Sequence, residues 1–171
     1  MVKMDTSWKF TERVEKYMVL FHTLCHTLDD EGWDYEYDEK NELIRFRVHG
    51  VNTDFNVFLI VDEEQESLLC NTYITQKISK NKRADVCEFM NRVNYELDNG
   101  NLEMDMDDGE IRYRTFLDLS DTAPSKEQIL NLIWNGPQCF DTYFSGLMKM
   151  IYNNFTPEEA ANSCLTENML V

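Results

Sequence analysis

The sequence predicts an α+β fold in which an antiparallel sheet of five or six strands carries helices packed on one face. Amphipathic helical patterns open and close the chain. Between them, strand-like segments alternate apolar and polar residues and are separated by short polar turns. Because neighbouring segments with short connections pair antiparallel, and the helical stripes need apolar cover, the helices should pack on the sheet.

The length and charge limit the kinds of protein this chain can be. Its 171 residues suit one domain, expected from about residue 5 to 160, with a mobile C-terminal tail at 161–171. The formal net charge is −16, yet 43% of the residues are hydrophobic, so the chain should fold. A surface this acidic repels phosphates and anionic lipids, so we expect no nucleic acid and no membrane as partners.

The N-terminal segment and the cysteines indicate a cytoplasmic protein. Residues 1–5 lead into an amphipathic segment and not into the apolar core of a secretion signal. The five cysteines are widely spaced and include no CxxC pair, which argues against a disulfide framework or a zinc ribbon. We expect reduced thiols.

The first helix is expected from Thr6 or Ser7 to Leu28, and Gly32 should end it. Four strand-like segments follow. Trp33–Tyr37 alternates, a polar turn leads to the alternating Ile44–His49, and the nearly continuous apolar run Phe55–Val61 is typical of a central strand. The fourth segment, Leu68–Ile74, is rich in β-forming residues.

A helix is expected from about Lys82 to Leu97, and a β-hairpin should come after it. With Asp108 and Gly109 as a two-residue turn, the expected cross-strand pairs are Met106 with Ile111, Met104 with Tyr113, Asp105 with Arg112 and Glu103 with Arg114. A long final helix begins after Ser125 and should be kinked or split at Gly136–Pro137. Residues Thr156–Glu159 form a capping box that predicts one more short helix.

Several of these segments are similar to a known family. The helix Arg83–Leu97 with its Asn91-Arg92-Val93-Asn94 stretch, the Asp108-Gly109-Glu110 turn and Phe140-Asp141-Thr142-Tyr143 together resemble the YbjN-type "putative bacterial sensory transduction regulator" family over most of the chain. The resemblance implies a bacterial protein with a fold like that of type III secretion chaperones. It also implies protein binding more than catalysis, and it brings no catalytic motif.

Metal binding and catalysis have little support in the residues themselves. His22, Cys25 and His26 share one helix, but these few ligands, with no third His or CxxC nearby, favour ordinary packing over a zinc site. The Asp105–Gly109 stretch does not fit a calcium loop, because methionines would occupy ligand positions. No catalytic motif occurs, so we expect no enzyme, no metal and no cofactor. An enzyme with a carboxylate pair hidden among the 32 acids remains an alternative.

The strands provide the candidate site. Four of the seven arginines alternate outward from apolar positions, and three apolar residues share their parity. The predicted partner-binding residues are Arg45, Arg47, Phe58, Ile60, Arg112, Arg114 and Phe116. Arginines mixed with apolar groups are typical of protein interfaces. The alternative is that the arginines only pair with strand acids such as Glu103 and Asp105, while a helix covers the apolar residues.

An acidic segment of the chain allows two interpretations. Seven acids in the eleven residues 29–39 form either a solvated, charge-protected edge or a docking patch for a basic partner. The function we expect is a non-enzymatic, chaperone-like or regulatory module that binds a protein or peptide partner, and a homodimer is one form open to it. The rival hypothesis is an acidic decoy or inhibitor of a basic or nucleic-acid-binding protein.

Overall fold

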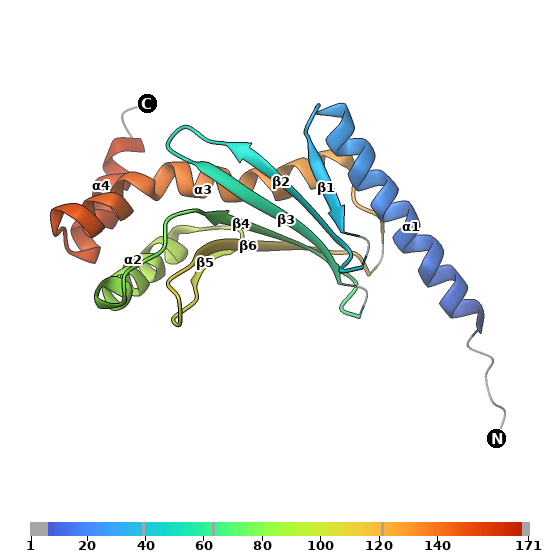
Figure 1. Cartoon of the computed structure of the whole chain (residues 1–171), viewed down its shortest axis with the longest axis horizontal. Helices are drawn as coiled ribbons and strands as arrows, with labels where there is room; N and C mark the ends of the chain where they lie inside the picture. Colours follow the sequence, from blue (N-terminus) through green and yellow to red (C-terminus); the bar gives the residue numbers. More distant parts are fainter. Residues whose placement is uncertain (1–6, 39, 63, 121, 169–171) are drawn as a thin grey trace, which may run out of the picture.

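The computed structural model describes residues 7–38, 40–62, 64–120 and 122–168. Figure 1 shows a curved sheet with a long helix behind it, a helix beside one edge and two helices at the other end. In chain order the elements are α1 (Ser7–Asp30), β1 (Tyr35–Asp38), β2 (Leu43–His49), β3 (Asp54–Asp62), β4 (Ser67–Ile74), the single-turn 3₁₀ helix η1 (Lys80–Lys82), α2 (Arg83–Glu96), β5 (Asn101–Met104), β6 (Ile111–Asp118), α3 (Lys126–Asn153) and α4 (Pro157–Asn168).

The sheet has six strands in the order β1-β2-β3-β4-β6-β5, and all neighbours are antiparallel. The predicted α+β class is therefore confirmed, with β1 as the sixth strand. β6 lies between β4 and β5 because the chain crosses through α2 to the far edge before it returns. The nearly continuous apolar segment predicted as a central strand is β3, which has two strand neighbours on one side and three on the other.

The core lies between the sheet and α3. Every second residue of β2 and β3 is buried, as alternation requires when one face is covered. Phe55 of β3 stacks on Phe140 of α3 with 5.8 Å between ring centroids. Gly136 allows the close approach of α3 to β4, since a Cβ at this residue would lie 2.2 Å from Oγ1 of Thr72.

The end of α1 and the start of α3 follow from their local chemistry. α1 ends in a left-handed turn at Gly32, where φ is +69° and the backbone N–H donates to the carbonyl of Asp29. α3 begins at a capping box, in which Ser125 accepts from the Gln128 backbone and Gln128 accepts from the Ser125 backbone. Of the two predicted starts of α1, Thr6 lies outside the described residues, and the described helix begins at the other, Ser7.

Of the two outcomes predicted at Gly136–Pro137, the split of the last long helix is wrong, and the kink stays a prediction. α3 is one continuous helix with Pro137 inside it. A proline removes one backbone donor and crowds the preceding turn. Here Ile133 and Phe140, on either side of it, are both buried against the sheet, and this tertiary packing outweighs the local cost.

The predicted register of the β5–β6 hairpin is wrong by two residues. Met104 is opposite Ile111 and Glu103 is opposite Arg112, and the strand ends before Asp105. A longer turn replaces the two-residue turn: the N–H of Gly109 donates to the carbonyl of Asp105, and Asp105 donates to the carbonyl of Glu110. Met106 is therefore 54% exposed instead of facing the core.

The packed part of the chain also extends beyond the predicted boundary at residue 161. The predicted capping box is present, since Thr156 and Glu159 exchange hydrogen bonds between side chains and backbone. α4 then continues to Asn168, and Ala161 and Cys164 are buried in the core cluster beside α3. Among the residues that the structure describes, no helix has the length and apolar content that a membrane span needs.

Candidate functional site

The candidate site is the face of the sheet opposite α3, which we call the open face. In the described part of the chain no helix lies over it (Figure 1). The strand register arranges its side chains in three rows that run across the strands. The first row is Arg47, Asn56, Tyr73, Arg112 and Glu103; the second is Glu36, Arg45, Phe58, Asn71, Arg114 and Asn101; the third is Leu43, Ile60, Leu69 and Phe116.

The structure thus brings all seven predicted partner-binding residues onto one face. β2 carries Arg45 and Arg47, and β6 carries Arg112 and Arg114. β3 and β4 lie between these two strands and contribute mostly apolar, aromatic and amide side chains. The arginines therefore form two borders, with an uncharged strip between them.

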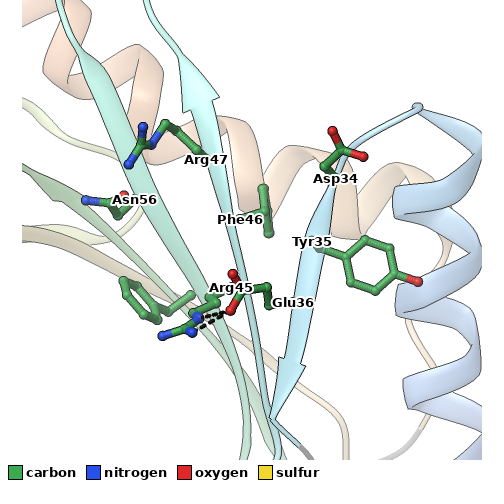
Figure 2. Close-up of a pocket in the computed structure, with 8 residues that line it drawn as sticks. Asp34, Tyr35, Glu36, Arg45, Phe46, Arg47 and Asn56 are labelled. Carbon is green, nitrogen blue, oxygen red and sulfur yellow. Dashed lines mark hydrogen bonds and ion pairs between the residues drawn. The ribbon is translucent and has the colours of Figure 1, made fainter.

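On the β2 border the two arginines differ in their contacts. Arg45 holds Glu36 of β1 through two guanidinium nitrogens, and its Nε lies 2.8 Å from Oε2 of the carboxylate. Figure 2 shows this pair by dashed lines, whereas the Arg47 side chain reaches across toward β3 without one. Within the described residues Arg47 has no ion-pair or hydrogen-bond partner, and its side chain is exposed. Arg47 is thus a cation available to a ligand.

On the β6 border the carboxylate of Glu103 joins both arginines. Arg112 donates from Nε to Oε2 of Glu103 at 2.7 Å, and its Nη2 lies 2.6 Å from the same oxygen as an ion pair. Arg114 is farther away, with Nη1 3.9 Å from Oε1. Burial raises the pKa of Glu103, but hydrogen bonds from Asn101 and Arg112 and the two guanidinium charges outweigh burial and lower it below its usual value. Arg114 keeps most of its donors free for a ligand.

The strip between the borders is apolar and only partly covered. Phe58 and Tyr73 meet edge to face, with 5.3 Å between ring centroids and 86° between ring planes. Phe116 is 62% exposed at the end of the face. Two hollows of about 510 Å³ each share Asn56 and Phe58, one extending toward β1 and β2 and the other toward β4. The face is therefore hollowed on both sides of Asn56 and Phe58.

Asn71 of β4 is the residue in this strip that sequence reasoning missed. It is 6% exposed, and its Oδ1 atom is buried without a hydrogen-bond partner. Its register neighbours are Phe58 and Arg114, and it lines the second hollow. The sequence feature that could have identified it is a single amide side chain in the middle of a strand of β-forming residues. A buried acceptor without a donor is unfavourable, so this position would gain from a ligand that donates a hydrogen bond.

The acidic segment at residues 29–39 is partly neutralised within the chain. Lys126 Nζ lies 3.1 Å from Asp30 and 3.1 Å from Glu31, and His26 lies 3.3 Å from Asp30. These contacts favour a solvated, internally paired edge over a docking patch. Among the described residues no group of three or more His, Cys, Asp or Glu side chains could hold a metal ion.

Comparison with known proteins assigns the family. Residues 21–148 match the model of the YbjN family, whose description is "Putative bacterial sensory transduction regulator". The chain belongs to the YbjN family. The chain is also similar to the crystal structure of E. coli YbjN, described as "a putative transcription regulator". The two share 15% sequence identity and a TM-score of 0.54, and the match covers 69% of this chain and 83% of that one. No curated protein matches.

The YbjN family is described as regulatory and not as a class of enzymes, and the structural likeness confirms the α+β fold. The likeness to type III secretion chaperones stays a prediction. Two residues in the segments that resemble the family have structural contacts in this chain. Asn94 bonds the backbone of Leu102, and Asp141 accepts from the backbone N–H groups of Val51 and Asn52 at 2.9 and 3.0 Å. These residues of the YbjN-like segments build the scaffold and lie off the open face.

Proposed function

We propose that this chain is a non-enzymatic regulatory protein, chaperone-like in action, that binds a protein or peptide segment on the open face. The observation that supports this most directly is the mixture of four arginines with partly exposed aromatic and aliphatic side chains on an uncovered face that carries two hollows. Arginine and aromatic residues are enriched at the energetic centres of protein interfaces. The family description as a regulator agrees with binding in place of catalysis.

The packing of the sheet gives a second argument. Sheets of this size normally bury both faces or keep one face polar. Here the outward positions of β3 and β4 include Phe58, Ile60 and Leu69, which are only partly buried. Covering them removes apolar surface from water, which is favourable by about 25 cal/mol for each Å². A protein ligand would supply that cover.

The test is affinity capture from bacterial lysate with the tagged chain, followed by identification of the captured protein and a binding measurement with both purified proteins. Phe58→Asp should weaken binding at least tenfold, because it places a charge in the apolar strip. Tyr95→Asp is the matched control, since Tyr95 is 87% exposed on α2, away from the open face. Circular dichroism and thermal unfolding confirm that both variants are folded.

Equal binding by wild type and folded Phe58→Asp would refute the proposal. The same experiment separates it from the decoy hypothesis, which the net charge of −16 favours. A decoy binds a basic protein through its acidic surface, so its binding would survive Phe58→Asp and fall steeply as salt is raised.

A further inference from the structure

We propose that the ligand of the open face is an acidic amphipathic helix of a partner protein, lying along β3 and β4 between the two arginine borders. This inference rests on the proposed function and specifies the chemistry of the partner. Its apolar stripe would cover Phe58, Ile60 and Tyr73. Its carboxylates, on either side of that stripe, would meet the arginines of β2 and β6.

The spacing of the borders suits a single helix. β2 and β6 are separated by β3 and β4, so the borders are three strand spacings apart, about 14 Å at about 4.8 Å for each spacing. A helix with its side chains is about 10–12 Å across. One helix therefore fills the strip and brings both of its flanks within reach of long arginine side chains.

The backbone of the sheet favours a helix over an extended peptide. β3 and β4 each pair with a strand on both sides, so their N–H and C=O groups are used within the sheet. An extended peptide laid on the face would have few partners for its own backbone groups. A helix satisfies those groups internally. α3 covers the opposite face in the same manner.

The charges of the borders select carboxylates. Arg47 has no partner among the described residues, and Arg114 reaches Glu103 only at 3.9 Å. Guanidinium groups bind carboxylates through two parallel hydrogen bonds. The chain is acidic as a whole, but at physiological salt charges interact over only about 8 Å, so the local arginines and not the net charge determine binding at this face.

Asn71 calls for a polar side chain at the centre of the partner helix. Its buried Oδ1 has no partner, and it lies between Phe58 and Arg114 in the register. Oδ1 is already shielded from solvent, so a purely apolar stripe would leave it without a donor, which is unfavourable. A Gln, Asn or Ser side chain in the middle of the stripe would supply the hydrogen bond.

A second copy of the chain fits this face poorly. A symmetric face-to-face dimer has a two-fold axis in the plane of the interface. Whether that axis runs along or across the strands, it places the arginine borders of one copy over those of the other, because both outer sides of the strip carry them. Like charges facing each other are unfavourable.

Three synthetic 18-residue helical peptides test the inference by isothermal titration calorimetry. They share one Leu-rich stripe with a central Gln, and their flanks carry Glu, Gln or Lys. The Glu peptide should bind at least tenfold more tightly than the Gln peptide, with a rise in helicity on binding. Arg47→Glu/Arg114→Glu should reverse the order in favour of the Lys peptide. The control Lys40→Glu/Lys80→Glu makes the same charge change at exposed residues off the open face and should keep the Glu preference.

Equal affinity for the Glu and Gln peptides, no binding of any peptide, or a Glu preference that survives Arg47→Glu/Arg114→Glu would each overturn the inference. If the double variant misfolds, the milder Arg47→Gln should still lower the affinity for the Glu peptide. Dimerisation in light scattering that Phe58→Asp abolishes would assign the face to a second copy and also overturn it. If partner capture is lost with Phe58→Asp but not with substitution of the arginines, the proposed function holds and this inference is wrong.

Discussion

Glu103 is the residue through which pH should affect the stability of the β5–β6 border. Its pKa in the folded chain is lowered, because hydrogen bonds from Asn101 and Arg112 and the arginine charges outweigh burial. The unfolded chain therefore takes up the proton first as pH falls. The stabilisation is present above about pH 4.5, the ordinary Glu value, and is lost as pH falls through the folded pKa.

Glu103→Gln should consequently lower the free energy of unfolding at pH 7 by about 1 kcal/mol, the scale of a partly exposed ion pair. The difference from wild type should shrink as pH falls below about 4.5, because the unfolded chain takes up the proton first, and it should be lost once pH has fallen through the lower pKa of folded Glu103. Urea unfolding at a series of pH values measures it. Glu64→Gln is the control, as Glu64 is exposed on a turn. A difference that stays constant down to acidic pH would contradict this account.

Two glycines with positive φ allow the cost of a strained backbone to be compared with the cost of a steric clash. Gly109 has φ +81°, and a Cβ there would lie 2.1 Å from the carbonyl oxygen of Ile78. Gly32 has φ +69°, and a Cβ there would meet nothing within 4 Å. Gly32→Ala should cost about 1 kcal/mol for the left-handed backbone alone. Gly109→Ala should cost about 1–3 kcal/mol more, because the Ile78 backbone must shift.

Thermal and urea unfolding of both glycine variants checks this difference. The N–H of Ile78 donates to the carbonyl of Gly109 at 2.8 Å, so the shift would also disturb that hydrogen bond. Equal destabilisation by the two substitutions would show that the close contact at Gly109 is relieved without cost.

At the scale of elements, Asn94 closes the outer edge of β5. Its Oδ1 accepts from the N–H of Leu102 at 2.8 Å, and its Nδ2 donates to the carbonyl of the same residue at 3.1 Å. The side chain thus takes the place of a neighbouring strand at this position. Unpaired strand edges promote pairing between molecules.

Asn94→Ala should therefore destabilise the chain by about 1–3 kcal/mol, since it leaves backbone groups of buried Leu102 without partners. It should also increase self-association, measured by light scattering over a range of concentrations. Asn91→Ala on the same helix is the control, because Asn91 is exposed and should change neither property. Unchanged stability and unchanged molecular mass for Asn94→Ala would contradict an edge-closing role.

The elements also show what the sequence could predict. Alternation fixed which side of each strand faces the core, and this survived the hairpin error: a shift of two residues keeps every side chain on its face, whereas a shift of one would reverse them. For this reason Arg112 and Arg114 lie where predicted. The turn itself depends on contacts from distant residues, such as Arg83 donating to the carbonyl of Met106, which no local pattern contains.

The misses share that cause. From local chemistry alone, a split at Pro137 is one of the two predicted outcomes, but burial of the surrounding helix surface keeps α3 continuous. Asn71 became a candidate only when the register placed it between Phe58 and Arg114 and its Oδ1 proved to be without a donor. Alternation could have added Tyr73, which shares the parity of Asn71 on β4, to the predicted site.

At the scale of the whole molecule, the net charge of −16 contrasts with the arginines gathered at the borders of the open face. Most of the surface repels itself, while the open face gathers four of the seven arginines. The other 12 of the 16 Lys and Arg residues must serve nearly all of the remaining acids, which therefore have few local partners. Long-range repulsion among them should therefore destabilise the folded chain at low ionic strength.

Raising NaCl from about 20 mM to about 300 mM should increase the free energy of unfolding by about 1 kcal/mol, because the Debye length falls and repulsion is screened. Salt also weakens exposed ion pairs such as Arg45–Glu36, but each of these contributes only about 0–1 kcal/mol. Glu64→Gln/Asp98→Asn brings the net charge from −16 to −14 and should reduce the salt dependence. Urea unfolding measures both. A free energy of unfolding that falls as salt is raised would contradict this account. It would show that the ion pairs, including those of Glu36 and Glu103 at the borders, stabilise the chain more than the repulsion among the remaining acids destabilises it.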